Sequence, residues 1–172
     1  PSIGAADNAA GAAVCMEAMR ILRKTGVKPR RTIRVALWGG EEEGYLGSKA
    51  YVNKHFSSPG SKEKCYMYFN TDNGAGRFRG IYMEERESLV PVMKKWFDMI
   101  NMNLVTAIGK TSNTDHVPFN EKGIPGFQFI QDALDYFRTY HTNMDRIERI
   151  PADDVRDNAI IMASLAYLAA IE

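Results

Sequence analysis

The sequence has little cysteine, little net charge and no long apolar run, and each shortage excludes a class of protein. Its 172 residues include only two cysteines, too few for a disulfide-stapled scaffold, and neither belongs to a Cys-x-x-Cys metal motif. The formal net charge of +1 gives no overall attraction to nucleic acid or to a membrane surface. No apolar stretch reaches the length needed to cross a bilayer. We therefore expect a single domain over residues 1–172, with neither nucleic acid nor membrane as a partner.

Three common catalytic motifs are also absent. The chain has no Gly-x-x-x-x-Gly-Lys-Ser/Thr phosphate loop and no Gly-x-Ser-x-Gly nucleophile elbow. It has no His-Glu-x-x-His helix, which excludes a thermolysin-type zinc site.

Apolar patterning predicts helices and strands that alternate along the chain. We expect helices over residues 7–24, 45–56, 87–102 and 151–171 and strands over residues 32–38, 65–71, 77–83 and 124–130. The 32–38 strand is β-branched and apolar, as in the centre of a sheet, whereas the 77–83 strand is expected at an edge. Such alternation predicts an α/β fold, a three-layer α/β/α sandwich around a mixed, mostly parallel central sheet.

Acidic residues and a histidine follow the expected strands. They are Glu41, Glu42 and Glu43 after the first strand, Asp72 and Asn73 after the second, and Asp132, Asp135 and His141 after the last. Asp7 stands just before the first helix, where a strand-to-helix loop would place it. Because ligands of open α/β sheets bind beyond the carboxyl ends of the strands, we expect these side chains at one rim.

This combination of carboxylates and imidazole, without cysteine, is suited to hydrolysis at a metal. Zinc accepts both donor types, and two zinc ions can share one bridging carboxylate. A cation also relieves the repulsion within the run of three glutamates. One glutamate of the run can then bind metal while its neighbour serves as the general base.

Each candidate also has a purely structural interpretation when it is taken singly. Asp7 could be a helix N-cap, and the glutamate run could be the first turn of a helix. Asp72, followed by Asn-Gly, could be part of a turn. His116 and His141 could be hydrogen-bonded loop histidines, and the aromatic residues of "FQFIQDALDYF" could belong to the core rather than to a pocket. His55 is expected to be a surface or packing residue. Four separate segments that deliver ligands to one rim favour the metal site over these alternatives.

Five segments resemble, in order, the motifs of the bridged di-zinc aminopeptidases of clan MH. They are "GAADNAAG", "WGGEEEGYLGS", "NTDNGAG", "TDHVPF" and "YHTNMD". Each segment alone is a weak signal, but the order and spacing agree from Gly4 to the C-terminal helix. The stretches "DNGAG" and "GFQFIQDALDY" resemble most the branch that includes plasma glutamate carboxypeptidase-like enzymes.

The resemblance implies a metal-dependent exopeptidase of the aminopeptidase or dipeptidase type, acting on peptide substrates. Asp7 would bridge two zinc ions, with Glu42 and His141 on one ion and Asp72 on the other. Glu41 would be the general base for a metal-bound hydroxide, and Glu43 only a surface charge. The resemblance also implies a cis peptide bond after Asp7. It assigns Asn8, Asp115 and His116 to an outer shell that orients the ligands, and Phe129, Ala133, Tyr136 and Tyr140 to the substrate pocket.

The sequence departs from the family pattern in two places. The family's first histidine ligand comes from a His-x-Asp segment upstream of the "GAADNAAG" motif, and residues 1–172 do not contain it. We therefore expect a partial domain that lacks N-terminal strands, binds one zinc or none, has little or no activity, and can form a homo-oligomer through an exposed sheet edge. The stretch "GKTSNTDH" also lacks the tyrosine that some relatives use to stabilise the oxyanion.

Two other functions stay open at this stage. The first is acyl transfer of the glutaminyl cyclase type, which uses the same fold and one zinc. The second is a non-catalytic member used for binding. The resemblance favours an exported location, periplasmic or extracellular.

Overall fold

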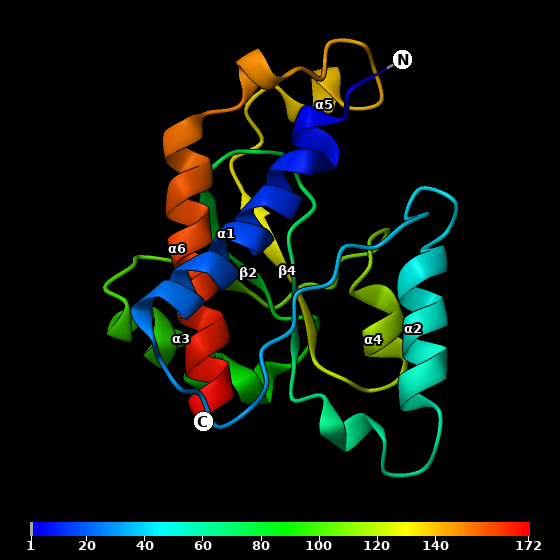
Figure 1. Ribbon diagram of the computed structural model, residues 1–172, viewed down its shortest axis with the longest axis vertical. Helices are drawn as coiled ribbons and strands as arrows, with labels where there is room; N and C mark the ends of the chain where they lie inside the picture. The colour runs from blue at the N-terminus through cyan, green and yellow to red at the C-terminus, as the bar shows by residue number, and fades with distance from the viewer. Residues whose placement is uncertain (1) are drawn as a thin grey trace.

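The computed structural model describes residues 2–172 and contains a four-stranded mixed sheet with helices on both sides (Figure 1). The strand order is β1 (Tyr68–Asn70), β4 (Gly126–Gln131), β2 (Phe78–Tyr82) and β3 (Val105–Ala107). β1 pairs parallel with β4, and β2 pairs parallel with β3, whereas β2 and β4 are antiparallel. The predicted α/β class with a mixed, mostly parallel sheet is confirmed.

The helices form two groups (Figure 1). One group is α1 (Ala10–Thr25), α3 (Val90–Met99) and α6 (Ala152–Ile171), and the other is α2 (Leu46–Phe56) and α4 (Val117–Glu121). The shorter elements are η1 (Ala5–Ala9), η2 (Lys62–Lys64), η3 (Glu87–Leu89), α5 (Tyr136–Thr139) and η4 (Ile147–Arg149). None of the helices within residues 2–172 has the length and apolar character of a membrane span.

The two long helices begin and end where their sequences dictate. α1 buries Val14 and Ala18 at helical spacing and ends at Gly26, which takes the left-handed conformation (φ 70°) that glycine adopts without a steric penalty. α6 follows Pro151 and carries Asp153 and Asp154 in its first turn, where carboxylates are stabilised by the helix dipole.

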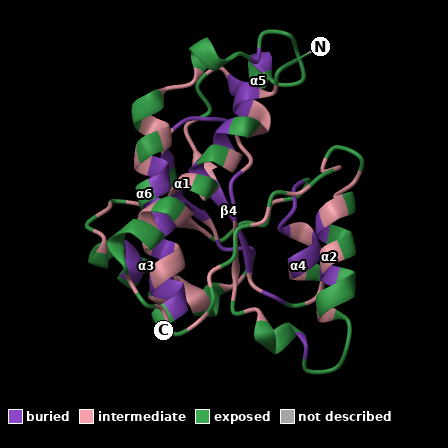
Figure 2. Cartoon of the chain, in the orientation of Figure 1, coloured by how far each residue is buried: buried purple, intermediate pink, exposed green. Residues whose placement is uncertain are grey.

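The core lies between the sheet and the group of α1, α3 and α6 (Figure 2). Phe78 of β2 and Phe129 of β4 stack with their ring centres 4.0 Å apart, and Trp96 of α3 is buried in the same cluster. Phe129 is completely buried in this cluster, so its expected place in a substrate pocket is wrong. Its ring faces the core because alternate residues of β4 point to opposite faces of the sheet.

The predicted strand over residues 32–38 is the main error of the secondary-structure prediction. This segment is not in a ladder, because no strand within residues 2–172 lies at hydrogen-bonding distance beside it. Its apolar side chains are therefore open to solvent: Val35 is 39% exposed and Leu37 is 58% exposed. A sequence suited to the centre of a sheet thus lies unpaired.

The predicted edge strand over residues 77–83 is an inner strand instead. β2 pairs with β4 on one side and with β3 on the other. Arg77 and Arg79, at the start of this segment, form ion pairs with Asp157 and Asp132. β3 was not predicted, because it is only three residues long and Val105 is 55% exposed, which gives little apolar signal.

Candidate metal centre

Three side chains from distant parts of the sequence meet at one end of the molecule. His141 Nε2 lies 3.0 Å from Asp7 Oδ2 and 2.7 Å from Glu42 Oε1. One ligand atom from each of the three residues lies within 4.8 Å of the other two. Asp7, Glu42 and His141 were all predicted as metal ligands, and the structure places them together.

Asp7 is held by the turn that precedes α1. The buried carboxylate of Asp145 accepts the backbone N–H groups of Ala6 (2.6 Å) and Asp7 (3.0 Å). The peptide bond from Asp7 to Asn8 is cis, as the resemblance implies. The Asn8 side chain donates a hydrogen bond to the carbonyl of Thr71, which ties the turn to the end of β1.

Glu41 and Glu42 lie in the turn between the 32–38 segment and α2. The carbonyls of Gly39 and Gly40 accept hydrogen bonds from the first residues of α2, Gly47 and Leu46, each at 2.9 Å. The Glu41 carbonyl accepts the N–H groups of Gly44 and Tyr45. This turn presents Glu41 and Glu42 to the centre.

Asp72 follows β1 and approaches the same place from the sheet. Its Oδ2 accepts a hydrogen bond from the Thr114 hydroxyl at 2.6 Å. Burial outweighs the opposing effect of this hydrogen bond and, with the nearby carboxylates of Asp7, Asp115 and Glu42, raises the pKa of Asp72 to about 6. Asp72 thus interacts electrostatically with Asp7 and Glu42 but lies outside the cluster of three.

Glu41 has the pKa expected of a general base at neutral pH. Burial, together with smaller contributions from the carboxylates of Asp72, Glu42, Asp115 and Asp7, raises the pKa of Glu41 to about 7. Glu41 is not a member of the three-residue cluster. Its carboxyl group can therefore hold or release a proton near neutral pH beside the cluster of Asp7, Glu42 and His141.

The residues of this centre fit a divalent cation. Burial and, to a smaller extent, repulsion from Glu42 also raise the pKa of Asp7. The negative charges of the neighbouring carboxylates therefore disfavour one another's ionised form. A cation offsets that repulsion. Zinc accepts both carboxylate oxygen and imidazole nitrogen, and three protein ligands leave its fourth position open, as in catalytic zinc sites.

The predicted outer-shell residues separate into two groups. Asn8 and Asp115 lie beside the centre; Asp115 accepts a hydrogen bond from Ser48 Oγ at 2.5 Å and contributes to the raised pKa of Glu41. His116 instead is fully buried, with its Nε2 3.0 Å from Thr111 Oγ1 and 3.3 Å from Glu84 Oε1. Within residues 2–172 His116 forms no hydrogen bond with the proposed ligands.

The predicted pocket residues also differ in their positions. Tyr136 hydrogen bonds with Asp7, which lowers the pKa of that carboxyl against the effect of burial, and Tyr140 stacks on Tyr136 with ring centres 5.1 Å apart. Ala133 lines a separate cavity of about 330 Å³ next to Asp72. Asp132 and Asp135, expected near the rim, are ion-paired with Arg79 and Arg149.

Three residues that support the centre had no predicted role. Asp145 holds the Asp7 turn, Thr114 holds Asp72, and Ser48 holds Asp115. Each belongs to one of the quoted motifs: the final Asp of "YHTNMD", the Thr of "TDHVPF" and the Ser of "WGGEEEGYLGS". Their place in those motifs was the available signal.

Comparison with known proteins places the chain in a family. Residues 1–166 match Peptidase family M28, so the chain belongs to this family. Carboxypeptidase Q of Rattus norvegicus is 25% identical over 168 residues, which cover 97% of this chain and 35% of that protein. The chain therefore spans about a third of the length of this relative.

Solved structures agree with the fold over nearly the whole chain. The crystal structure of a peptidase M28 precursor from Shewanella amazonensis SB2B is 29% identical with a TM-score of 0.88, covering 99% of this chain and 38% of that one. BSAP, a zinc aminopeptidase from Bacillus subtilis, is 26% identical with a TM-score of 0.78, covering 99% of this chain and 45% of that one.

Proposed function

We propose that Asp7, Glu42 and His141 bind a zinc ion and that the protein is a metal-dependent exopeptidase of the aminopeptidase type. The observation that carries this proposal is the meeting of three ligand atoms within 4.8 Å, from residues 7, 42 and 141 of the sequence. Membership of Peptidase family M28 and the similarity to a zinc aminopeptidase support the choice of metal and reaction. By the family resemblance Asp72 would contribute to a second zinc ion, but it lies outside the cluster of three, so we expect one ion in this chain, held by Asp7, Glu42 and His141.

Zinc at this centre supplies a Lewis acid and lowers the pKa of water. Glu41 takes the proton from the attacking water and returns it to the leaving amine, because a pKa of about 7 lets the carboxyl hold or release a proton at neutral pH. Asp145 and Asn8 keep the Asp7 turn in place through their hydrogen bonds. Asp115 keeps Glu41 in a negative environment and so maintains its basicity.

The cavity next to Asp72 is proposed to receive the side chain of the substrate. Its volume is about 330 Å³, and its apolar walls come from Tyr82, Ile130, Ala133 and Phe137. Asp72 is the only charged residue among those that line it. This lining favours uncharged substrate side chains.

A zinc titration by calorimetry tests the site. We expect the protein to bind about one zinc ion, and His141→Ala to weaken binding by about tenfold or more, because one of three ligands is lost. His55→Ala is the matched control, since His55 is exposed, packs against Tyr51 and is not part of the cluster of three. Equal affinities for the wild type and His141→Ala would contradict the proposal.

An activity assay tests the reaction. With zinc present, Glu41→Gln is expected to keep zinc binding and to lose hydrolysis of aminoacyl p-nitroanilides by about a hundredfold or more, whereas Glu43→Gln keeps both. Cyclisation of glutaminyl peptides without hydrolysis would favour the acyl-transfer alternative. Zinc binding with neither reaction would favour a non-catalytic binding member. We also propose an exported location, which rests on the family resemblance alone.

A further inference from the structure

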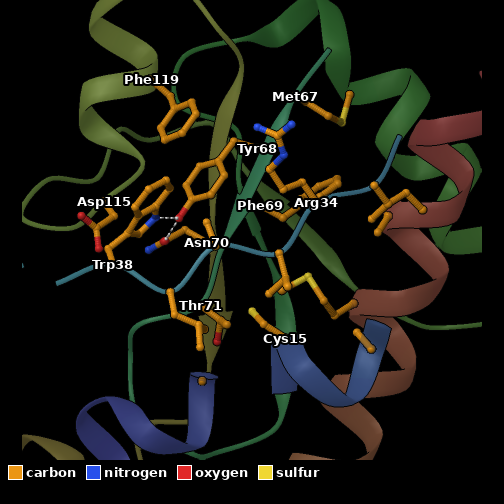
Figure 3. Close-up of a pocket in the computed structure, with 18 of the residues that line it drawn as sticks. Cys15, Arg34, Trp38, Met67, Tyr68, Phe69, Asn70, Thr71, Asp115 and Phe119 are labelled. Atoms are coloured by element: carbon orange, nitrogen blue, oxygen red, sulfur yellow. Dashed lines mark hydrogen bonds between the residues drawn. The ribbon is translucent and has the colours of Figure 1, made fainter. Parts of the chain in front are cut away.

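A chain of hydrogen bonds leads through side chains of β1 and of the loop before α4 to the carboxylate of Asp72. Trp38 Nε1 donates a hydrogen bond to Tyr68 Oη at 3.1 Å, and Tyr68 Oη donates to Asn70 Oδ1 at 2.6 Å (Figure 3). Asn70 Nδ2 donates to Thr114 Oγ1 at 2.9 Å, and Thr114 Oγ1 donates to Asp72 Oδ2 at 2.6 Å. We call these five residues the relay.

β1 and α4 hold the middle of the relay. Tyr68 and Asn70 are two residues apart on β1, so their side chains lie on the same face of the sheet. The Tyr68 ring stacks on Phe119 of α4 with ring centres 4.3 Å apart, which holds its hydroxyl beside Asn70. Asn70 is 6% exposed and Thr114 is 4% exposed, so these two side chains have to find their hydrogen-bond partners within the protein.

The two ends of the relay determine the direction of its hydrogen bonds. The Trp38 indole N–H can only donate, and an ionised Asp72 carboxylate can only accept. Each hydroxyl between them has one hydrogen, which Tyr68 gives to Asn70 and Thr114 gives to Asp72. If the Asn70 amide were turned over, the Tyr68 hydrogen would lose its acceptor, and two oxygens would compete for the Thr114 hydrogen. The Asn70 amide thus has one orientation that satisfies every group of the relay.

Gln128 of β4 adjoins the relay at Asn70. One end of its amide lies 2.7 Å from Asn70 Nδ2, and its oxygen can face either that nitrogen or the backbone N–H of Asp72. The second orientation would place two amide nitrogens, both of them donors, 2.7 Å apart. The orientation of Asn70 that the relay requires therefore favours the first, in which Gln128 Oε1 accepts a hydrogen bond from Asn70 Nδ2.

We infer that Asn70 is a positioning residue for Asp72. By donating to the Thr114 hydroxyl, Asn70 fixes that side chain in the rotamer that donates to Asp72 Oδ2. Oδ2 is then occupied, and Oδ1, which accepts no hydrogen bond from residues 2–172, is left to a cation. Partners that orient a carboxylate ligand in this way commonly change metal affinity or activity when they are lost. The effect on hydrolysis rests on the proposed function, whereas the effect on Thr114 does not.

NMR of the protein in chelator tests the relay without an activity. Three-bond couplings should show a single χ1 rotamer for Thr114, and its hydroxyl hydrogen should exchange slowly with water. Asn70→Leu has a similar shape and cannot donate, so it should speed this exchange by about tenfold and average the rotamers. Tyr68→Phe keeps the stacked ring, loses only the hydroxyl and should speed the exchange too; it replaces Asn70→Leu should that variant not fold. Asn53→Leu, at an exposed position of α2, is the control and should change neither quantity.

A double-mutant cycle tests whether Asn70 acts through Thr114. Thr114→Val keeps the shape and loses the hydrogen bond to Asp72, so hydrolysis of aminoacyl p-nitroanilides should fall by about tenfold. Asn70→Leu should lower hydrolysis by about threefold or more in the wild type and no further in Thr114→Val. A purely structural Asn70 would instead lower it in both backgrounds.

Two results would overturn the inference. The first is Thr114 hydroxyl exchange and χ1 couplings that are the same in the wild type, Asn70→Leu and Tyr68→Phe. The second is a loss of hydrolysis on Asn70→Leu that is equal in the wild type and in Thr114→Val. If the wild type hydrolyses no peptide substrate, the proposed function fails, while the exchange measurement still decides this inference.

Discussion

Asp145 is expected to stabilise both the fold and the metal centre through the turn that carries Asp7. Its buried carboxylate accepts two backbone N–H groups, from Ala6 at 2.6 Å and from Asp7 at 3.0 Å. In Asp145→Asn one acceptor oxygen becomes an amide that cannot accept, so one charge-assisted hydrogen bond is lost. Such bonds contribute about 1.5–3 kcal/mol, and we expect the free energy of unfolding to fall by about 2 kcal/mol.

For a chain of this length, that loss lowers the Tm by about 4–8 °C. Thermal unfolding followed by circular dichroism measures the change, with a chelator present so that zinc does not contribute. Zinc affinity should also fall by about tenfold, because groups that orient metal ligands typically contribute that much. Asp98→Asn, an exposed aspartate of α3, is the control and should change neither quantity.

The result that refutes this reasoning is an Asp145→Asn variant with wild-type stability and wild-type zinc affinity. A loss of stability with unchanged zinc affinity would show instead that the turn is held by Asn8 and the rest of the fold. In that case Asp145 would be a purely structural residue.

Three further predictions concern packing and ionisation. Gly11→Ala places a methyl group 2.6 Å from the Thr71 carbonyl oxygen and closer still to the Asn8 side-chain oxygen. We expect this clash to lower the free energy of unfolding by about 1–3 kcal/mol in urea titrations. Gly109→Ala is the control, because open space surrounds Gly109. Phe129→Ala should cost about 3–5 kcal/mol by the same assay, because Phe129 is a core residue. The pKa of Asp72 is raised in the folded state, so between pH 3.8 and about 6 the metal-free folded protein holds a proton that the unfolded chain has released. The free energy of unfolding should therefore fall as the pH rises through this window. Urea titrations at several pH values measure this slope, which Asp72→Asn should flatten.

Much of the fold was predictable because the long elements carry strong local signals. α1, α2 and α6 lie within two or three residues of their predicted bounds, since their apolar spacing and end residues act locally. The 32–38 segment shows the limit of such reasoning. Its β-branched sequence favours the interior of a sheet, but a strand forms only where a neighbouring strand supplies backbone hydrogen bonds.

The candidate site was predictable to the extent that residue type determines its chemistry. Asp7, Glu42 and His141 were identified as zinc ligands from their motifs, and the structure brings them together. His116 could not be placed from sequence, because its neighbour Glu84 comes from a different part of the chain and draws it into a buried pair. Phe129 was misplaced for a similar reason, since its partner Phe78 lies on another strand.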